Sequence, residues 1–485
     1  MVDKFIFDLI VIGTGVAGSA VASECSSNGL KVAIIDEVPF GGTCALRGCE
    51  PKKILVEAAK TIDSFQRHKN KGISNMDEIS IKWHDLIKFK RTFTDSVPKE
   101  REESYVSVGI VPFHGPAKFV GPDSVLVGND SSNAILNGKN IVIATGAKPA
   151  NLNIPGSENV ITSDQFLELD KEQLPDNIVF IGGGYISFEF AHIAARSGAK
   201  RITILHRGKQ PLEHFDPDLV DQLVQKSRDI GINIILEKKV ERIENLGTSL
   251  TDNATIKGNK LSVHFSSIID SSLNRDSSLT APTNSKVEAD LVVHGAGRSP
   301  NIMNLELTSG KVDYTSKGIR VNRYLQSVTN PVVYAAGDSV DNGGAPLTPV
   351  ATYDGHIVAN NILNGNTMES TYKGLPSVVF TIPPLASVGL TEKMAREQGL
   401  RFRINNQDTS NWYSSKRVGE THSGYKVLVE EESDKILGAH LLGPHSDEVI
   451  NIFSIAIRLG LTTKELNDPI LYAYPTNSSD VVYML

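Results

Sequence analysis

The chain has 485 residues, of which 40% are hydrophobic and 22% are charged. This length is too great for one hydrophobic core and predicts about three or four domains. The composition is that of a folded globular protein, without low-complexity bulk. A formal net charge of −7 gives no general attraction to phosphate backbones or anionic lipids, so we expect neither nucleic acid nor a membrane as a partner.

Cysteine usage and the start of the chain both favour the cytoplasm. Only Cys25, Cys44 and Cys49 occur, which is too few for an extracellular disulfide scaffold of this size. The sequence runs from Met1 directly into a strand pattern, without the basic leader or cleavage site of an export signal. It has no apolar stretch of about 20 residues, so we expect no membrane span.

The first motif is a strand at 9–12, a glycine turn and a helix at about 19–28. The turn contains Gly13, Gly15 and Gly18, which permit close approach of the backbone to a pyrophosphate at the helix N-terminus. A second strand, at 31–35, ends in Asp36, where an acidic group meets a ribose hydroxyl. The complete unit predicts a dinucleotide site. The alternative is an ordinary α/β glycine turn.

A second unit of this kind lies far downstream, with a strand at 178–181, a turn at 182–187 and a helix that ends near Ser197. Ser187 replaces the final glycine and is small enough to keep the helix close to the strand. The next strand, at 201–205, ends in His206-Arg207-Gly208-Lys209 instead of an acid, which suits the 2′-phosphate of NADPH. The alternative is that Arg207 and Lys209 are solvated surface charges. Two different dinucleotide sites imply electron transfer between a bound flavin and a diffusible nicotinamide.

Cys44 and Cys49 follow the first ribose-binding acid closely and are candidates for a redox-active pair. In an ideal helix five residues rise about 7.5 Å, beyond the usual ~4.4–6.8 Å between the Cα atoms of a disulfide. A bridge therefore needs a distorted turn, which Gly48 and Pro51 can accommodate, and a strained bridge is more reducible. Metal ligation, without a nearby histidine, and coincidental free thiols are the alternatives. Cys25 is interpreted as a packed core thiol.

These motifs together resemble the class I pyridine nucleotide-disulfide oxidoreductases, the family of glutathione reductase, dihydrolipoamide dehydrogenase and mercuric reductase. The match covers nearly the whole chain in family order. After the opening glycine motif it comprises GGTCALRGCEPKK at 41–53, IVIATGAKP at 141–149, GGGYISFE at 182–189, HGAGRSPN at 294–301, VVYAAGDSV at 332–340, LTPVATYDGHIVANNI at 347–362, VVFTIPPLASVGLT at 378–391 and GAHLLGPHSDE at 438–448.

The resemblance implies an α/β fold with two Rossmann-like dinucleotide-binding domains, for FAD and NAD(P), and an α+β C-terminal dimerisation domain. The expected segments are 1–156 and 290–346 for FAD binding, 157–289 for NAD(P)H binding and 347–485 for the dimer interface. A largely helical excursion is expected at 83–107. The Ser-, Thr- and Asn-rich stretch 248–285 reads as strands with long exposed turns and has no assigned function.

By the same resemblance, Cys49 is the sulfur next to the flavin and Cys44 is the interchange thiol that attacks the substrate. Lys52 would approach the flavin and pair with Glu189, while Tyr185 would cover the flavin until nicotinamide displaces it. A cation near the flavin favours the anionic reduced form and a nearby thiolate. Taken alone, Lys52 and Glu189 are also consistent with unrelated surface charges.

The resemblance also implies a larger set of cofactor-binding residues and no metal ligands. Asp338 would hold the ribityl chain of FAD, and residues 144–146 would close the FAD domain. The complete set expected to bind FAD and NADPH is Gly13, Gly15, Gly18, Asp36, Gly42, Thr43, Thr145, Gly146, Asp338, Gly182, Gly184, His206, Arg207, Lys209 and Gly297.

The C-terminal region departs from the family pattern. Disulfide reductases end with His-Pro-Thr and a Glu five residues after the His, an acid-base dyad that reaches the partner subunit's cysteines. Tyr474 and Ser479 stand at these two positions. A phenol, with an unperturbed pKa of about 10, is a poor base near pH 7 but can donate a proton. Mercuric reductases resemble this chain in having tyrosine there, yet they end in an adjacent cysteine pair that is missing here. The glutathione-binding arginines are replaced by Ser23 and His356.

The resulting hypothesis is an NAD(P)H-dependent, FAD-containing disulfide oxidoreductase. Electrons would pass from NADPH through FAD to the Cys44-Cys49 disulfide and on to a small disulfide or related oxidised thiol, with Tyr474 or water as the proton donor. One alternative acceptor is a metal ion or a quinone. Another reading is a flavin-based redox sensor or partner switch with little turnover. The expected assembly is a homodimer in which Tyr474 completes the opposite subunit's site.

Overall fold

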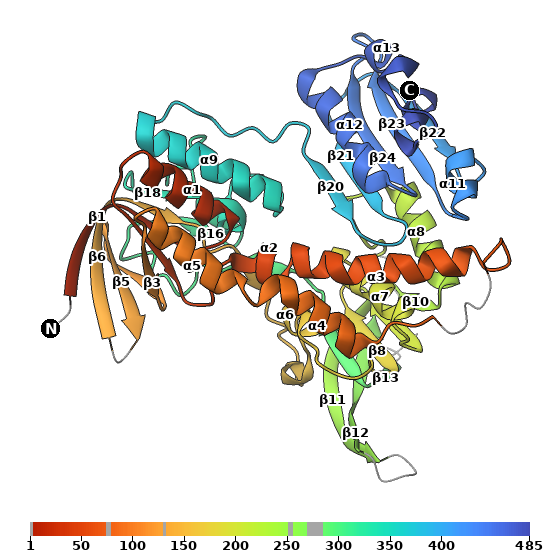
Figure 1. The fold of residues 1–485 in the computed structure, drawn as a ribbon, viewed down its shortest axis with the longest axis horizontal. Helices are drawn as coiled ribbons and strands as arrows, with labels where there is room; N and C mark the ends of the chain where they lie inside the picture. The colour runs from red at the N-terminus through yellow and green to blue at the C-terminus, as the bar shows by residue number, and fades with distance from the viewer. Residues whose placement is uncertain (1–2, 74–78, 130–131, 251–255, 269–284) are drawn as a thin grey trace, which may run out of the picture. The chain divides into compact units, whose positions relative to one another are not determined.

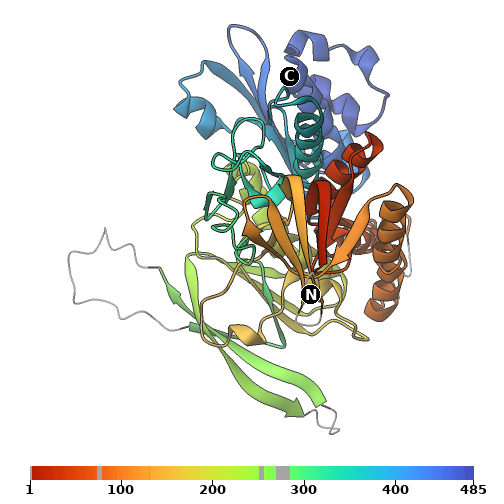
Figure 2. The same cartoon turned by 90° about the vertical axis from the view of Figure 1, so that its left-hand side faces the viewer.

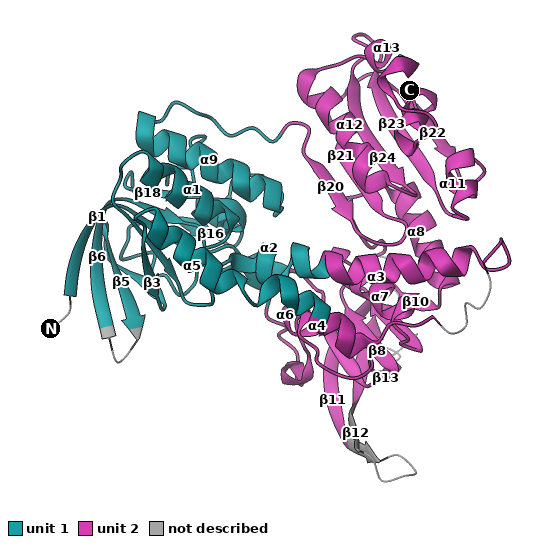
Figure 3. Ribbon diagram, in the orientation of Figure 1, with its two compact units in different colours: residues 1–52, 89–150, 298–372 teal, residues 53–88, 151–297, 373–485 magenta. Residues whose placement is uncertain are grey.

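The computed structural model describes residues 3–73, 79–129, 132–250, 256–268 and 285–485. They form two compact units, shown in Figure 3. Unit 1 comprises 1–52, 89–150 and 298–372, and unit 2 comprises 53–88, 151–297 and 373–485. Within the described ranges, no helix combines the length and apolar character needed to cross a membrane.

Unit 1 is built on a sheet with strand order β3-β2-β1-β6-β5-β4, to which β18 adds beside β6. β1 pairs in parallel with β2 and β6, and its end, 9–12, is buried. A continuous apolar run is typical of parallel strands that are covered on both faces. The strands are β1 (Asp3–Ile12), β2 (Val32–Asp36), β3 (Val111–His114), β4 (Ala117–Gly121), β5 (Ser124–Asn129), β6 (Ser132–Ile143) and β18 (Val333–Ala335).

Helices α1 and α9 lie side by side in unit 1 (Figure 1). They approach closely at Gly355, where an added Cβ would lie 2.8 Å from the carbonyl oxygen of Ala17. The helices are α1 (Val16–Ser27), α2 (Gly42–Arg47), α5 (Val97–Ser107) and α9 (Thr348–Asn364), with α3 (Cys49–Arg67) and α4 (Trp83–Thr94) continuing from one unit's sequence into the other's. The smaller elements are β7 (Ala147–Pro149), β15 (Arg298–Pro300), β16 (Tyr314–Thr315), β17 (Gly318–Arg320), η3 (Gly337–Ser339) and β19 (Val340–Asp341).

Unit 2 contains the second strand-turn-helix unit of the chain. Its strands belong to a parallel sheet of order β10-β9-β8-β14. The sheet β11-β12-β13 packs on it and includes the long green hairpin of Figure 2. The bounds are β8 (Asn177–Ile181), β9 (Arg201–Leu205), β10 (Ile232–Ile235), β11 (Lys238–Leu250), β12 (Ile256–Ser267), β13 (Ser285–Ala289) and β14 (Leu291–His294), with helices η2 (Ser157–Asn159), α6 (Ser163–Leu167), α7 (Tyr185–Arg196) and α8 (Pro217–Asp229). Part of the predicted stretch 248–285 lies outside the described residues.

The C-terminal part of unit 2 is a five-stranded antiparallel sheet of order β20-β21-β24-β23-β22 with α12 packed on it. Its strands are β20 (Pro376–Val379), β21 (Leu385–Gly389), β22 (Phe402–Asp408), β23 (Gly424–Glu430) and β24 (Ile436–Leu442). Its helices are α10 (Glu392–Glu397), α11 (Tyr413–Arg417), α12 (Ser446–Leu459), α13 (Thr463–Leu466), η4 (Pro469–Leu471) and η5 (Asn477–Tyr483).

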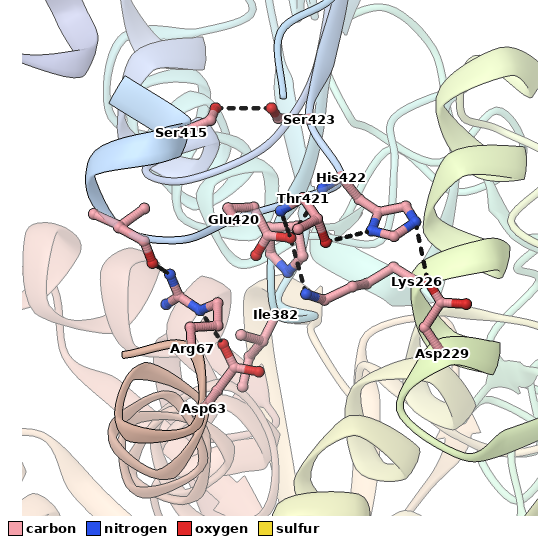
Figure 4. Close-up of polar contacts among 12 residues, drawn as sticks. Asp63, Arg67, Lys226, Asp229, Ile382, Ser415, Glu420, Thr421, His422 and Ser423 are labelled. Atoms are coloured by element: carbon pink, nitrogen blue, oxygen red, sulfur yellow. Dashed lines mark hydrogen bonds and ion pairs between the residues drawn. The ribbon is translucent and has the colours of Figure 1, made fainter. Parts of the chain in front are cut away.

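Buried ion pairs connect distant segments within unit 2, as Figure 4 shows in part. Asp63 of α3 pairs with Arg196 of α7 at 2.6 Å, and both side chains are almost inaccessible. Lys226 of α8 pairs with Glu420 at 2.9 Å. Breaking such a pair leaves an uncompensated buried charge, so the pairs specify how these segments meet more than they add net stability.

Candidate active site

The predicted distorted turn lies between the two cysteines. Helix α2 ends at Arg47, Gly48 leaves the helical conformation with φ −140° and ψ −114°, and α3 begins at Cys49. An added Cβ on Gly48 would lie 2.8 Å from the carbonyl oxygen of Thr43, so a larger residue would force the turn open. The break brings the sulfurs of Cys44 and Cys49 within hydrogen-bonding distance of each other.

Both cysteines are free thiols in this structure, with Cys44 half-buried and Cys49 exposed. The hydroxyl of Thr348, the first residue of α9, lies 3.3 Å from the sulfur of Cys49 and donates a hydrogen bond to the sulfur of Cys44, also at 3.3 Å. The hydrogen bond with Cys49, followed by burial, raises the pKa of the Cys44 thiol, and the Thr348 hydroxyl opposes that rise. Cys44 therefore keeps its proton and is a thiol at neutral pH. Sequence reasoning missed Thr348, although it is the second residue of the motif at 347–362.

The loop that leads into α2 packs against the first glycine turn. The N–H of Gly41 donates to the hydroxyl of Thr14 at 3.2 Å, and an added Cβ on Gly42 would lie 2.4 Å from the Cα of Gly15. Cys44 follows Gly42 by two residues. The turn that is expected to cradle a nucleotide therefore also positions the helix that carries Cys44 within unit 1.

The first glycine turn fits FAD. Gly13 has φ +113°, and an added Cβ would lie 2.2 Å from the carbonyl oxygen of Ala144. Asp36 accepts hydrogen bonds from the N–H and hydroxyl of Thr14 at 2.8 and 2.6 Å. The hydroxyl of Thr145 is buried without a hydrogen-bond partner among the described residues, as expected of a group that serves a ligand.

Three other predicted FAD-site residues lie in unit 1 around this turn. Gly18 packs against the turn, since an added Cβ would lie 2.0 Å from the carbonyl oxygen of Gly13. Gly146 accepts a hydrogen bond from the N–H of Asn301 at 2.9 Å. Burial raises the pKa of the Asp338 carboxyl, and Arg298 opposes the rise. A carboxyl that is mostly buried in this way is suited to accept hydrogen bonds from ligand hydroxyls.

The second glycine turn fits NADPH but refines the part expected of His206. Gly182 has φ +106°, and an added Cβ would lie 2.4 Å from the carbonyl oxygen of Gly295. His206 accepts the N–H of Gly183 at 3.1 Å through Nδ1, and its Nε2 donates to the carbonyl oxygen of Gln210 at 3.0 Å. Burial lowers the pKa of His206, so the ring is a neutral acceptor.

The positive charge for a 2′-phosphate thus falls to Arg207 and Lys209, which are both exposed. Gly184 ends the turn as the N-cap of α7 and leaves open space, with its nearest neighbour 3.7 Å from an added Cβ. Gly297, with φ +106°, likewise has nothing within 4 Å. Backbone without side chains is what a pyrophosphate needs for close approach.

Tyr185 and Glu189 both lie on α7. Tyr185, the first helical residue, is 43% exposed, and Glu189 is buried and accepts the N–H of Phe380 at 2.9 Å. Glu189 is therefore an ordered interior carboxylate and no surface charge. Lys52 belongs to unit 1, and its pairing with Glu189 stays a prediction.

Tyr474 and Ser479, which stand at the two positions of the family's acid-base dyad, differ in exposure and in hydrogen bonding. Tyr474 is 82% exposed, so its phenol is accessible to a second chain or a substrate. Ser479 is buried and donates its hydroxyl to the carbonyl oxygen of Thr476 at 2.6 Å within the cap of η5. Ser479 is committed to local structure and does not replace a dyad carboxylate.

Known proteins with a similar sequence and fold combine the same elements. Residues 7–355 match the family described as pyridine nucleotide-disulphide oxidoreductase, and 375–485 match its dimerisation domain, which supports a homodimer. Glutathione reductase of Burkholderia cepacia is 30% identical, covering 99% of this chain and 98% of the relative. Mercuric reductase of Staphylococcus aureus is 29% identical over 95% of this chain and 79% of the relative.

A solved structure of a flavoprotein disulfide reductase has a similar fold. The Cu(II) complex of the HOCl-induced flavoprotein disulfide reductase RclA from Escherichia coli has a TM-score of 0.82 and 26% identity, covering 99% of this chain and 98% of that one. Members of this family that resemble glutathione reductase use FAD and NADPH. The chain belongs to the pyridine nucleotide-disulphide oxidoreductases and is an FAD-dependent, NADPH-using disulfide reductase.

Proposed function

We propose that the protein reduces a small disulfide or related oxidised thiol, with Cys44 as the attacking sulfur. The observation that carries this proposal is the pair of free sulfurs that share the Thr348 hydroxyl beside the first nucleotide turn. The Cys44 thiolate forms a bond with one substrate sulfur and breaks the substrate disulfide. Cys49 then attacks Cys44, which closes the protein disulfide and releases the second thiol.

The first leaving thiolate takes its proton from Tyr474 of the partner subunit or from water. The exposure of the phenol supports this role, and its chemistry suits proton donation better than proton abstraction near pH 7. Light scattering should find a dimer. A stable, fully active monomer would contradict a site shared between subunits.

The acceptor is proposed to differ from glutathione disulfide. Nδ1 of His356 lies 2.8 Å from a carboxylate oxygen of Glu24, so the imidazole at this position already has an acidic partner. A substrate carboxylate would have to compete with Glu24. Ser23, one residue before it, carries no charge. This arrangement favours a neutral small disulfide over one rich in carboxylates, within a reducing cytoplasm.

The test is NADPH oxidation by the FAD-loaded enzyme with a panel of disulfides, Cu(II) and Hg(II) salts, and quinones. We expect turnover with a small neutral disulfide and a loss of at least about 100-fold in Cys44→Ser. Cys25→Ala is the matched control because Cys25 is buried in the core of unit 1. Quinone turnover that survives Cys44→Ser, without any disulfide turnover in the wild type, would contradict the proposal.

A further inference from the structure

Thr348 is the single hydroxyl that the described structure places on both sulfurs. It approaches Cys44 and Cys49 at 3.3 Å each, and the two residues lie 304 and 299 positions away in the chain. A hydroxyl carries one proton to donate and lone pairs to accept, so it can take a proton from one sulfur while giving its own to the other. This is the connectivity of a one-step proton relay.

The reaction needs such a relay because the two sulfurs exchange roles. The hydrogen bond with Cys49 and burial raise the pKa of Cys44, so the Cys44 thiol holds its proton at neutral pH. Attack on a substrate requires the Cys44 thiolate instead. Among the described residues no histidine contacts the Cys44 sulfur, and Ser479 is committed to its own cap.

We propose that Thr348 is a catalytic residue that carries the proton between Cys44 and Cys49. In the first transfer, the Cys44 thiol gives its proton to Oγ1 of Thr348 while Thr348 gives its own to the Cys49 thiolate. The pair keeps one proton and one negative charge, and Cys44 becomes the nucleophile. This inference rests on the proposed disulfide reduction and deepens its mechanism.

The same hydroxyl serves the second half of the reaction in reverse. Cys44 then forms a mixed disulfide with half of the substrate, and Cys49 is a thiol. As the Cys49 sulfur attacks Cys44, its proton passes to Thr348, and the Thr348 proton passes to the leaving sulfur. The protein S–S bond forms, the mixed S–S bond breaks, and the product departs as a neutral thiol. Atoms and charge balance without another base.

The position of Thr348 on its helix supports the role. It is the first residue of the 17-residue helix α9, whose N-cap, Leu347, makes no side-chain cap. Unpaired N–H groups and the helix dipole favour negative charge at this end. The hydroxyl therefore hands a proton between two sulfurs at a place where either one is tolerated as a thiolate.

The test compares Thr348→Val, which keeps the shape, with Thr348→Ser, which keeps the hydroxyl. Thr352→Val is the matched control, since Thr352 lies one turn later on α9 and bonds only the carbonyl oxygen of Thr348. With bis(2-hydroxyethyl) disulfide at pH 7, we expect Thr348→Val to lose at least about tenfold in kcat, and the other two variants to stay within about threefold of the wild type. FAD content verifies folding.

The pH profile separates chemistry from structure. Because the pKa of Cys44 is raised, its thiol persists at pH 9.5, but hydroxide is then far more abundant than at pH 7 and can take the proton without the relay, so the defect of Thr348→Val should shrink to about threefold or less. A Thr348→Val rate within about twofold of the wild type at pH 7, or an equal defect at both pH values, overturns the relay.

A second measurement needs no acceptor. In the NADPH-reduced protein, the pH midpoint of Cys44 alkylation by iodoacetamide, followed by mass spectrometry, should rise in Thr348→Val because a hydrogen bond to the thiolate is lost. An unchanged midpoint overturns the relay. A raised midpoint in an enzyme whose wild type reduces no disulfide supports the hydrogen bond and rejects the proposed function instead.

Discussion

The two glycine turns share a backbone design and differ in the charge of the side chain at the end of the next strand. In both, a residue at the end of the second strand or directly after it accepts a hydrogen bond from an amide of the turn, Asp36 from Thr14 and His206 from Gly183. The first acceptor is a carboxylate, which can also bind ribose hydroxyls. The second is a neutral imidazole, which tolerates a phosphate. One turn design thus fits two different nucleotides, and the residue at this position separates the two turns together with the exposed Arg207 and Lys209.

The largest expected effect comes from the shared backbone. Gly13→Ala would place a Cβ 2.2 Å from the carbonyl oxygen of Ala144 at a φ of +113°, and we expect a loss of about 4 kcal/mol or more in the free energy of unfolding. Gly29→Ala is the control, because φ is +87° but nothing lies within 4 Å, so only strain of about 1–2 kcal/mol remains. Urea unfolding measures both. Equal losses would contradict the steric argument.

The carboxylate of the first turn should matter next. Asp36→Ala removes the acceptor of the Thr14 N–H and hydroxyl and the expected ribose contact, so FAD should bind at least about tenfold more weakly. Asp36→Asn keeps a hydrogen-bond acceptor without the charge, so its FAD affinity should lie between that of the wild type and that of Asp36→Ala. Fluorescence titration of deflavinated protein gives the dissociation constants. Unchanged FAD affinity in Asp36→Ala would remove this residue from the site.

Exchanging the distinguishing side chain should change cofactor choice. His206→Asp gives the second turn the acceptor of the first, which repels a 2′-phosphate and can bind ribose hydroxyls. We expect the ratio of kcat/KM for NADPH to that for NADH to fall by about tenfold or more. His206→Asn, which stays neutral, is the control and should keep the preference. A larger ratio in His206→Asp would contradict the comparison.

The smallest effect is on pH dependence. Burial lowers the pKa of His206, so the unfolded chain binds its proton more tightly than the folded protein does. The stability that the neutral ring contributes is present above about pH 6.5 and is lost as pH falls through the folded-state pKa. His206→Asn should therefore lose less unfolding free energy than the wild type between pH 7.5 and 5.5. An identical pH dependence would mean that His206 does not titrate differently on folding.

Short sequence patterns correctly predicted the two strand-turn-helix units and the helix break between the cysteines. Both strand, turn and helix units form, although α1 begins at Val16, inside the motif, instead of at Ser19. Gly48 breaks the helix between the cysteines as its sequence position indicated, and Cys25 is buried. Glycine and strand patterns carry these features because backbone conformation and periodicity decide them.

Side-chain contacts between distant segments could not be predicted from local sequence patterns. Thr348 meets sulfurs about 300 residues earlier in the chain, and although it lies in the motif at 347–362, the local pattern did not predict that contact. His206 looked like part of a cationic cluster, whereas its ring is turned to the glycine amide and is neutral. Glu189 accepts the Phe380 amide across a long separation in sequence. Side-chain direction and burial set these roles, and both arise only after the chain has folded.

The most direct test of the account counts thiols during reduction. The FAD-loaded, air-oxidised protein is titrated with NADPH under anaerobic conditions, alkylated and analysed by mass spectrometry. We predict that one equivalent of NADPH exposes Cys44 and Cys49 together to alkylation and leaves Cys25 unchanged. If the flavin is reduced while both cysteines were already alkylable before NADPH, or remain bridged after it, the cysteine pair is not the electron exit of this enzyme.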